Sequence, residues 1–202
     1  MKTVIIATKN KGKAKEFSSL FADYGMEVKT LIDYPALADV EETGETFEEN
    51  AILKAKTISN ETGQLVIADD SGLSIDALEG RPGVYSARYA GADKDDEANI
   101  QKVLAELQGL PMEKRTARFH CVLAIARPGK ETVTVSGTCE GKITMMKKGE
   151  NGFGYDPIFW LEDFERTMAE LQPEEKNSVS HRGVAMRKLG RMLPELIGGE
   201  TG

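Results

Sequence analysis

The chain has 202 residues, of which 40% are hydrophobic and 29% are charged, and this composition predicts a folded globular protein with a substantial core. Its 26 basic and 33 acidic residues give a net charge of -7, which argues against a protein that grips a nucleic-acid backbone. The first residues lack a small-residue cleavage site, and nowhere do about 18 apolar residues run together. We therefore expect a cytoplasmic protein with neither a nucleic-acid nor a membrane partner.

The N-terminal half alternates between strand and helix patterns. An apolar run at 4–7 leads into a polar loop at 8–12 and then into apolar residues at helical spacing, which predict a strand, a loop and a helix. Thr46 and Glu49 form a capping-box pattern that predicts the start of a second helix. A buried strand is expected at 65–68, and it runs directly into Asp69 and Asp70. These carboxylates are therefore expected at the C-terminal end of a strand.

The C-terminal half contains a third amphipathic helix near 100–107, then two β-rich stretches at 116–127 and 131–140. The segment 127–130 between these stretches is typical of a hairpin turn, and a last helix is expected to begin near Ser180. Cys121 and Cys139 lack metal-ligand spacing, so we interpret them as reduced packing residues. The pattern as a whole predicts one α/β domain over residues 1–202 with a mixed sheet.

A polar, lysine-rich loop joins the first strand to the first helix. Free backbone amides and the helix dipole favour an anion at such a position, and a phosphate would fit there. The loop lacks the Gly-x-x-x-x-Gly-Lys-Ser/Thr pattern of ordinary kinases and ATPases. A solvated basic face is the alternative interpretation, and the segment alone does not decide between them. The residues concerned are Thr8, Lys9, Asn10, Lys11, Gly12 and Lys13.

Two acidic pairs are candidates for binding a hard cation. Magnesium takes oxygen ligands, and an ion held by one or two carboxylates and by triphosphate oxygens needs no dedicated protein cage. Glu41 and Glu42 precede the second helix, and Asp69 and Asp70 follow the predicted third strand. Taken singly, each pair is more often a turn, a helix cap or a solvated loop. Only the combination favours a metal site.

Two further groups of residues have the chemistry of a base-binding site. The segment Gly152 to Pro157 combines flexible glycines with aromatic rings, so its backbone can approach a flat ring on which an aromatic face stacks. An ordinary glycine-rich turn is the alternative. Lys176, His181 and Arg182 offer donors suited to carbonyl oxygens on a base, although a His-Arg pair at a helix start is more often a surface feature.

Taken together, these motifs resemble the inosine triphosphate pyrophosphatase-like enzymes, which clear the nonstandard purine nucleotides XTP, ITP and dITP. The resemblance extends in order through nearly the whole chain, with no departure at a motif position. The matching stretches are 7–13, 41–44 with 49–51, 68–72, 83–89, 152–157 and 180–183.

The resemblance implies an elongated α/β fold with a mixed sheet, flanking helices and two lobes around a central substrate cleft. It also implies a homodimer, a magnesium cofactor and hydrolysis to the nucleoside monophosphate and pyrophosphate. Glu41 and Asp70 would hold the metal, and Asp70 would also accept a proton from the attacking water. The residues that would contact the substrate are Thr8, Lys9, Asn10, Lys11, Gly12, Lys13, Ser71, Phe153, Gly154, Tyr155, Asp156, Lys176, His181 and Arg182.

The two aspartates have alternative interpretations. A carboxylate bound to magnesium has a lowered pKa, so the alternative role for Asp70 is to orient a metal-activated water without accepting its proton. Adjacent residues of a regular strand point to opposite faces, so we expect Asp70 to line the site and Asp69 to lie behind it. A pyrophosphatase for pyrimidine or modified nucleotides and a nucleotide sensor without turnover are the alternative functions.

Overall fold

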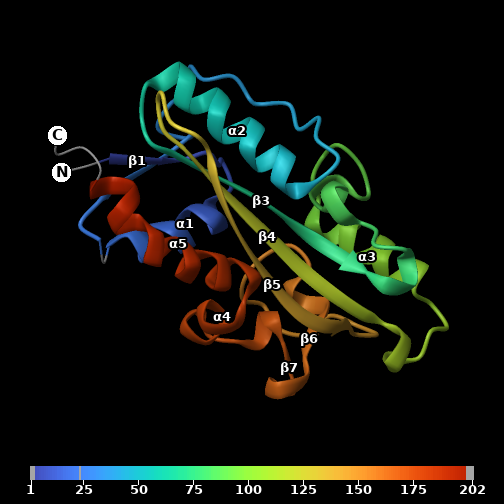
Figure 1. The fold of residues 1–202 in the computed structure, drawn as a ribbon. Helices are drawn as coiled ribbons and strands as arrows, with labels where there is room; N and C mark the ends of the chain where they lie inside the picture. The colour runs from blue at the N-terminus through green and yellow to red at the C-terminus, as the bar shows by residue number, and fades with distance from the viewer. Residues whose placement is uncertain (1–2, 23, 199–202) are drawn as a thin grey trace. The chain divides into compact units, whose positions relative to one another are not determined.

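In the computed structural model, residues 3–22 and 24–198 are described, and they form an α/β fold (Figure 1). The helices are α1 (Lys11–Ala22), α2 (Phe47–Thr62), α3 (Asp96–Glu106), α4 (Pro173–Val179) and α5 (His181–Gly198). The strands are β1 (Thr3–Ile6), β2 (Glu27–Thr30), β3 (Val66–Ile75), β4 (Thr116–Ala126), β5 (Val133–Ile143), β6 (Phe159–Leu161) and β7 (Arg166–Thr167). Short 3-10 turns connect several of these elements.

The strands form one mixed sheet in the order β2-β1-β3-β4-β5-β6-β7. β1 is parallel to both β2 and β3, whereas β6 is antiparallel to both β5 and β7. The prediction of an α/β fold with a mixed sheet and flanking helices is therefore confirmed. Among the described residues, no helix is both long and apolar enough to cross a membrane.

Local sequence signals account for the positions of the main helices. Thr46 accepts a hydrogen bond from the backbone of Glu49, whose side chain in turn accepts from the backbone of Thr46, so the expected capping box begins α2. The left-handed residue Gly63 ends this helix. The expected last helix begins at His181 as α5, and the expected turn at 127–130 joins β4 to β5.

The fold divides into two compact units. Three of the divisions fall within the three longest strands, and the fourth falls within α5. Unit 1 comprises the described residues of Met1–Asp70, Cys121–Ser136 and Val184–Gly202. Unit 2 comprises Ser71–His120 and Gly137–Gly183. β3, β4 and β5 therefore each contribute residues to both units.

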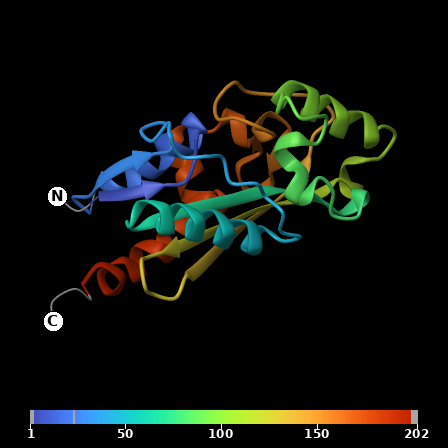
Figure 2. The same cartoon turned by 90° about the horizontal axis from the view of Figure 1, so that it is seen from above.

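Unit 1 has three layers because the strand residues alternate between two hydrophobic clusters. Val4 and Ile6 pack with α1 and α5, whereas Ile5 and Ala7 pack with α2. Figure 2 shows α2 running along the strands. This arrangement buries both faces of the strands, as parallel strands require.

Unit 2 has one core cluster, built from the far ends of the long strands and from α3. Leu73 and Ile75 of β3, Phe119 of β4 and Ile143 of β5 are buried there, and α3 contributes an apolar stripe that includes Val103. The short strands β6 and β7 lie at the edge of the sheet next to β5.

The third strand is longer than the sequence pattern predicts. The prediction that Asp69 and Asp70 follow the end of this strand is wrong, since β3 continues to Ile75. The buried residues Leu73 and Ile75 extend the apolar pattern beyond the polar segment, and the two carboxylates have cationic partners. The two aspartates therefore lie within a regular strand, where consecutive side chains project to opposite faces.

Candidate functional site

The loop before α1 lies in unit 1 and has the features of an anion-binding helix start. Thr8 is buried and its hydroxyl accepts a hydrogen bond from the backbone of Asn10 at 3.1 Å. The side-chain oxygen of Asn10 accepts from the backbone of Lys13, also at 3.1 Å, as an N-cap does. The first turn of α1 contains no acidic residue, although helices favour negative charge there. A bound phosphate would provide that charge.

The lysines of this loop differ in their surroundings. Lys9 pairs with Asp39 on the surface, and Lys11 is exposed, as the solvated-face interpretation requires. Lys13 has a side chain that is only 17% exposed, and its ammonium group pairs with Asp69. The structure therefore sets Lys13 apart from its neighbours, and Gly12 lies beside it in the same helical turn.

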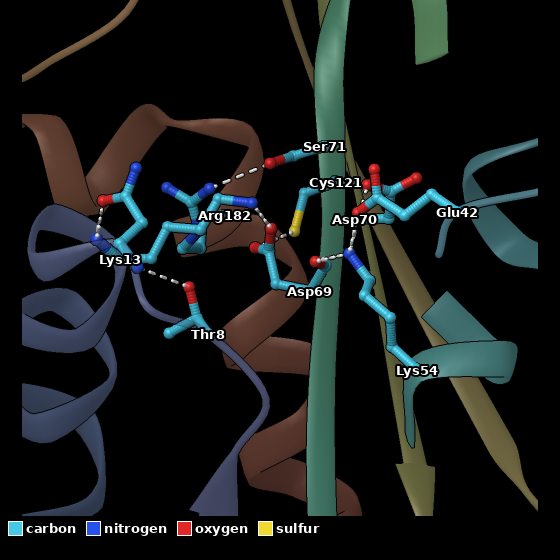
Figure 3. A network of polar contacts seen from close by, with 10 residues as sticks. Thr8, Lys13, Glu42, Lys54, Asp69, Asp70, Ser71, Cys121 and Arg182 are labelled. Atoms are coloured by element: carbon cyan, nitrogen blue, oxygen red, sulfur yellow. Dashed lines mark hydrogen bonds and ion pairs between the residues drawn. The ribbon is translucent and has the colours of Figure 1, made fainter. Parts of the chain in front are cut away.

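The two adjacent aspartates lie on opposite sides of β3, as Figure 3 shows. The Asp69 side chain has no exposed surface and contacts Lys13 and the Cys121 thiol. The Asp70 side chain lies on the other side, 3.3 Å from the ammonium group of Lys54. The two side chains therefore project to opposite faces of the strand, as expected, and the assignment of Asp70 to the substrate site stays a prediction.

Lys54 organises the acidic cluster around Asp70. Its ammonium group lies 2.8 Å from a Glu42 carboxylate oxygen and donates to the backbone carbonyl of Asp69 at 2.8 Å. Burial alone lowers the pKa of Lys54, but the charges of Asp70 and Glu42 outweigh this effect and raise it. The lysine thus remains charged and is shared by several acceptors.

The electrostatics of the cluster suit a further cation. Burial raises the pKa of Asp70 more than the nearby charge of Lys54 lowers it, and the charge of Glu42 raises it further. Within the described part of the chain, the Asp70 Oδ2 atom is buried and accepts no hydrogen bond. No group of three or more His, Cys, Asp or Glu side chains there has the arrangement of a metal site. Any cation at Asp70 would therefore take most of its ligands from substrate oxygens or water.

The acidic pair before α2 is divided between two environments. Glu41 is exposed, whereas Glu42 is partly buried and shares Lys54 with Asp70. The metal-ligand role predicted for Glu41 stays a prediction. Glu42 is a second candidate for the metal-ligand role, and the sequence pattern does not predict its contact with Lys54.

Unit 2 holds the second group of candidate residues, centred on the ring of Phe153. The ammonium group of Lys176 lies 4.8 Å from the ring centre, and the guanidinium group of Arg182 lies 5.6 Å from it. Cations at such distances interact favourably with an aromatic face. The structure therefore brings Lys176 and Arg182, which are near each other in the sequence, to the ring of the more distant Phe153.

The loop that carries Phe153 is held by hydrogen bonds along its length. Asp156 accepts from the Phe153 backbone at 2.9 Å and lies 2.8 Å from the ammonium group of Lys176. The backbone of Gly154 donates to Asp96, and the Tyr155 hydroxyl donates to the Ser86 carbonyl. Gly152 approaches Asp156 so closely that a Cβ atom would lie 2.0 Å from its carboxylate oxygen. The loop is thus a fixed platform rather than an ordinary flexible turn.

The donors that precede and begin α5 are buried, which excludes the surface interpretation for them. The exposed fractions are 7% for Lys176, 6% for His181 and 2% for Arg182. Arg182 donates to the Ser71 hydroxyl at 3.0 Å, and the His181 ring stacks on Phe119 at 4.7 Å between centres. Buried donors fixed in this way favour recognition of a polar ligand over general solvation.

Sequence reasoning missed two residues that the structure adds to these groups. Lys54 lies on α2 at the interior-facing spacing of a helix, and a lysine at such a position is a signal that could have identified it. Ser86, within the 83–89 motif, accepts from the Leu73 backbone at 2.8 Å and also anchors Tyr155. Its role depends on contacts that no spacing rule reveals.

The fold and these two groups of residues define a class of α/β proteins, and the chain belongs to the Ham1 family, which it matches over residues 4–192. A protein from Bacillus cereus named dITP/XTP pyrophosphatase is 59% identical over 99% of this chain and 98% of its own length. A protein of the same name from Bacillus subtilis is 57% identical over 96% of this chain and 98% of its own length. The solved structure of the Staphylococcus aureus Ham1 protein is 46% identical and superposes with a TM-score of 0.86, covering 96% of this chain and 99% of its own.

Proposed function

We propose that this protein hydrolyses nonstandard purine nucleoside triphosphates, namely ITP, dITP and XTP, to the monophosphate and pyrophosphate. The proposal rests on the contacts of two consecutive residues of β3. Asp70 shares the ammonium group of Lys54 with Glu42, and the hydroxyl of Ser71 accepts a hydrogen bond from Arg182. One group of residues suits phosphates and a cation, and the other suits a purine ring. The names of the Bacillus relatives agree with this activity.

The phosphate-binding role falls to residues 8–13. Backbone amides at the start of α1 and the ammonium group of Lys13 supply positive charge without a competing acidic residue in the first helical turn. Lys9 and Lys11 are exposed and contribute mainly to the positive electrostatic potential around the loop. Thr8 and Asn10 hold the loop in shape through their hydrogen bonds.

We propose Asp70 as the proton acceptor and as a magnesium ligand, with Glu41 or its neighbour Glu42 as the second acidic ligand. A magnesium ion bound there would neutralise phosphate charge and activate the attacking water. The raised pKa of Asp70 in the metal-free protein is suited to a residue that accepts a proton. No covalent nucleophile is required.

Base recognition falls to unit 2. Phe153 offers an aromatic face, and Lys176, His181 and Arg182 offer buried donors for the 6-oxygen of hypoxanthine or xanthine. Adenine carries an amino group at that position, so a donor would face a donor and buried polar groups would stay unpaired. We therefore expect ATP to be a poor substrate.

Other parts of the proposal concern the whole protein. We propose that it acts as a homodimer in the cytoplasm, with a single domain over residues 1–202. The net charge of -7 supports a small-molecule substrate over nucleic acid. A pyrophosphatase for pyrimidine nucleotides and a binding protein without turnover are the functions to be distinguished from this one.

The test is a substrate panel of ITP, XTP, GTP, ATP and UTP with magnesium, with pyrophosphate and phosphate measured separately. We expect pyrophosphate release and a kcat/KM for ITP about a hundredfold above that for ATP. Arg182→Ala should reduce this ratio, whereas Arg191→Ala, at an exposed position of α5, should leave it unchanged. Circular dichroism checks that both variants fold. Equal use of ATP and ITP would contradict the base assignment, and tight binding without turnover would indicate a sensor.

A further inference from the structure

Asp69 is a buried carboxylate whose two oxygens are engaged by two different elements of unit 1. Lys13 of α1 pairs with Oδ1, and the thiol of Cys121 on β4 lies 3.3 Å from Oδ2 (Figure 3). The Asp69 side chain has no exposed surface. A buried carboxylate is unfavourable unless it is paired and hydrogen-bonded, so these contacts account for its presence in the core.

Lys13 is the residue that benefits from this contact. A lysine side chain is long and flexible, and fixing it in one conformation costs entropy. Its ammonium group carries three N–H donors, so one directed to Asp69 leaves two for phosphate oxygens. The backbone of Lys13 is also held, by the side chain of Asn10. Both ends of the residue are thereby fixed before a ligand arrives.

A comparison with Lys9 shows how specific this arrangement is. Lys9 also pairs with an aspartate, Asp39, but the two side chains are 49% and 77% exposed. Such a surface pair is weak and does not hold either side chain in one conformation. In the Lys13–Asp69 pair the exposed fractions are only 17% and 0%, and Asp69 directly precedes Asp70 on β3.

We propose that Asp69 is a positioning residue: with the Cys121 thiol as its second donor, it holds the Lys13 ammonium group in place for the phosphates of the substrate. The inference rests on the proposed function for its substrate, but its binding step does not require turnover. It assigns to Asp69 neither metal binding nor proton transfer, which the proposed function gives to Asp70 on the other side of the strand.

The first test measures equilibrium binding by calorimetry, with pyrophosphate and IMP as separate probes in the presence of magnesium. Asp69→Asn removes the charge that holds Lys13 and should weaken pyrophosphate binding about tenfold, the effect expected for a lost charged hydrogen bond. Binding of IMP should change much less. Asp163→Asn removes an exposed carboxylate of unit 2 and is the charge-matched control, for which neither affinity should change.

The second test is a double-mutant cycle on kcat/KM for ITP, using Asp69→Asn and Lys13→Ala. If Asp69 acts through Lys13, its substitution should lower kcat/KM in the wild type but have little effect when Lys13 is already absent. The same factor in both backgrounds would overturn the proposal, because a residue that only maintains the core does not depend on Lys13. An equal loss of pyrophosphate and IMP affinity would overturn it as well.

A second pair of variants keeps the proposal testable if Asp69→Asn does not fold. Cys121→Ala removes the second donor, and Cys121→Ser restores one in nearly the same place. We expect Cys121→Ala to weaken pyrophosphate binding while sparing IMP binding, and Cys121→Ser to restore it. Unchanged pyrophosphate affinity in Cys121→Ala would overturn the part assigned to the thiol, and equal losses for both probes would overturn the positioning role. If the wild type binds pyrophosphate but does not hydrolyse ITP, the proposed function fails while these binding results still decide the role of Asp69.

Discussion

Asp70 is a buried carboxylate that shares one lysine with Glu42, and this crowding determines its chemistry. The substitution Asp70→Asn keeps nearly the same shape but removes the charge and the ability to accept a proton. We expect kcat for ITP to fall by about a hundredfold or more, the usual contribution of a general base. The measurement is the steady-state rate at several magnesium concentrations. Near-normal turnover would remove Asp70 from the mechanism.

The same substitution should change how the stability of the metal-free protein depends on pH. Burial raises the pKa of Asp70 above its ordinary value of 3.8, so the folded state binds this proton more tightly than the unfolded state does. The resulting stabilisation is fully present below that ordinary value and is lost as the pH rises through the raised pKa. Wild type should therefore lose stability relative to Asp70→Asn across this interval, as urea unfolding would show. A constant difference between the two proteins would contradict the raised pKa.

For individual residues, the sequence indicates which side chains have the chemistry of a site but not which of them come into contact. A lysine-rich helix start and two adjacent aspartates are visible as patterns, so Lys13, Asp69 and Asp70 could be selected. The Lys13–Asp69 contact joins residues 56 positions apart, and no local spacing rule predicts such a pair. Lys54 was missed because its role depends on facing Asp70 and Glu42, which only the folded chain brings together.

The Phe153 loop illustrates how one small residue determines the conformation of an element. Gly152 has a φ of +77°, and a Cβ atom there would lie 2.0 Å from the Asp156 carboxylate and 3.1 Å from the Lys176 ammonium group. Gly152→Ala should therefore destabilise the fold by about 1 to 3 kcal/mol and displace the loop. We expect KM for ITP to rise as well, because the Phe153 ring is carried on this loop.

Gly129→Ala is the matched control for this substitution. Gly129 lies in the turn between β4 and β5, has a φ of +68° and has no atom within 4 Å of an added Cβ. Gly129→Ala should lower the free energy of unfolding only by the cost of a left-handed backbone at alanine, about 1 to 2 kcal/mol. Its KM for ITP should be unchanged. Thermal unfolding and ITP kinetics of both variants separate the two effects. Equal KM values in the two variants would contradict a role for the Phe153 loop in binding.

The elements themselves were predicted where a strong local signal exists. The capping box at Thr46 begins α2 as expected, and the β-rich stretches form β4 and β5. The end of β3 was missed because Asp69, Asp70 and Ser71 have turn-forming chemistry, whereas tertiary contacts hold them in a strand. The strands β6 and β7 contain only three and two residues, too few for any periodicity to appear.

Across the whole molecule, three strands cross the division between the two units. Because β3, β4 and β5 each contribute to both units, opening one unit disrupts strands of the other. We therefore expect one cooperative thermal transition, in agreement with a single domain over the chain. Scanning calorimetry should show equal calorimetric and van't Hoff enthalpies. Two resolved transitions would mean that the units unfold independently.

The two cysteines lie on neighbouring strands of the sheet but belong to different units. Cys121 of β4 is in unit 1 and Cys139 of β5 is in unit 2, and both thiols are buried. Burial, together with the charges of Glu140 and Asp156, raises the pKa of Cys139 to about 11, so this thiol is protonated at neutral pH. An alkylating reagent can reach either sulfur only when its surroundings open. The protein thus carries one natural reporter of transient opening in each unit.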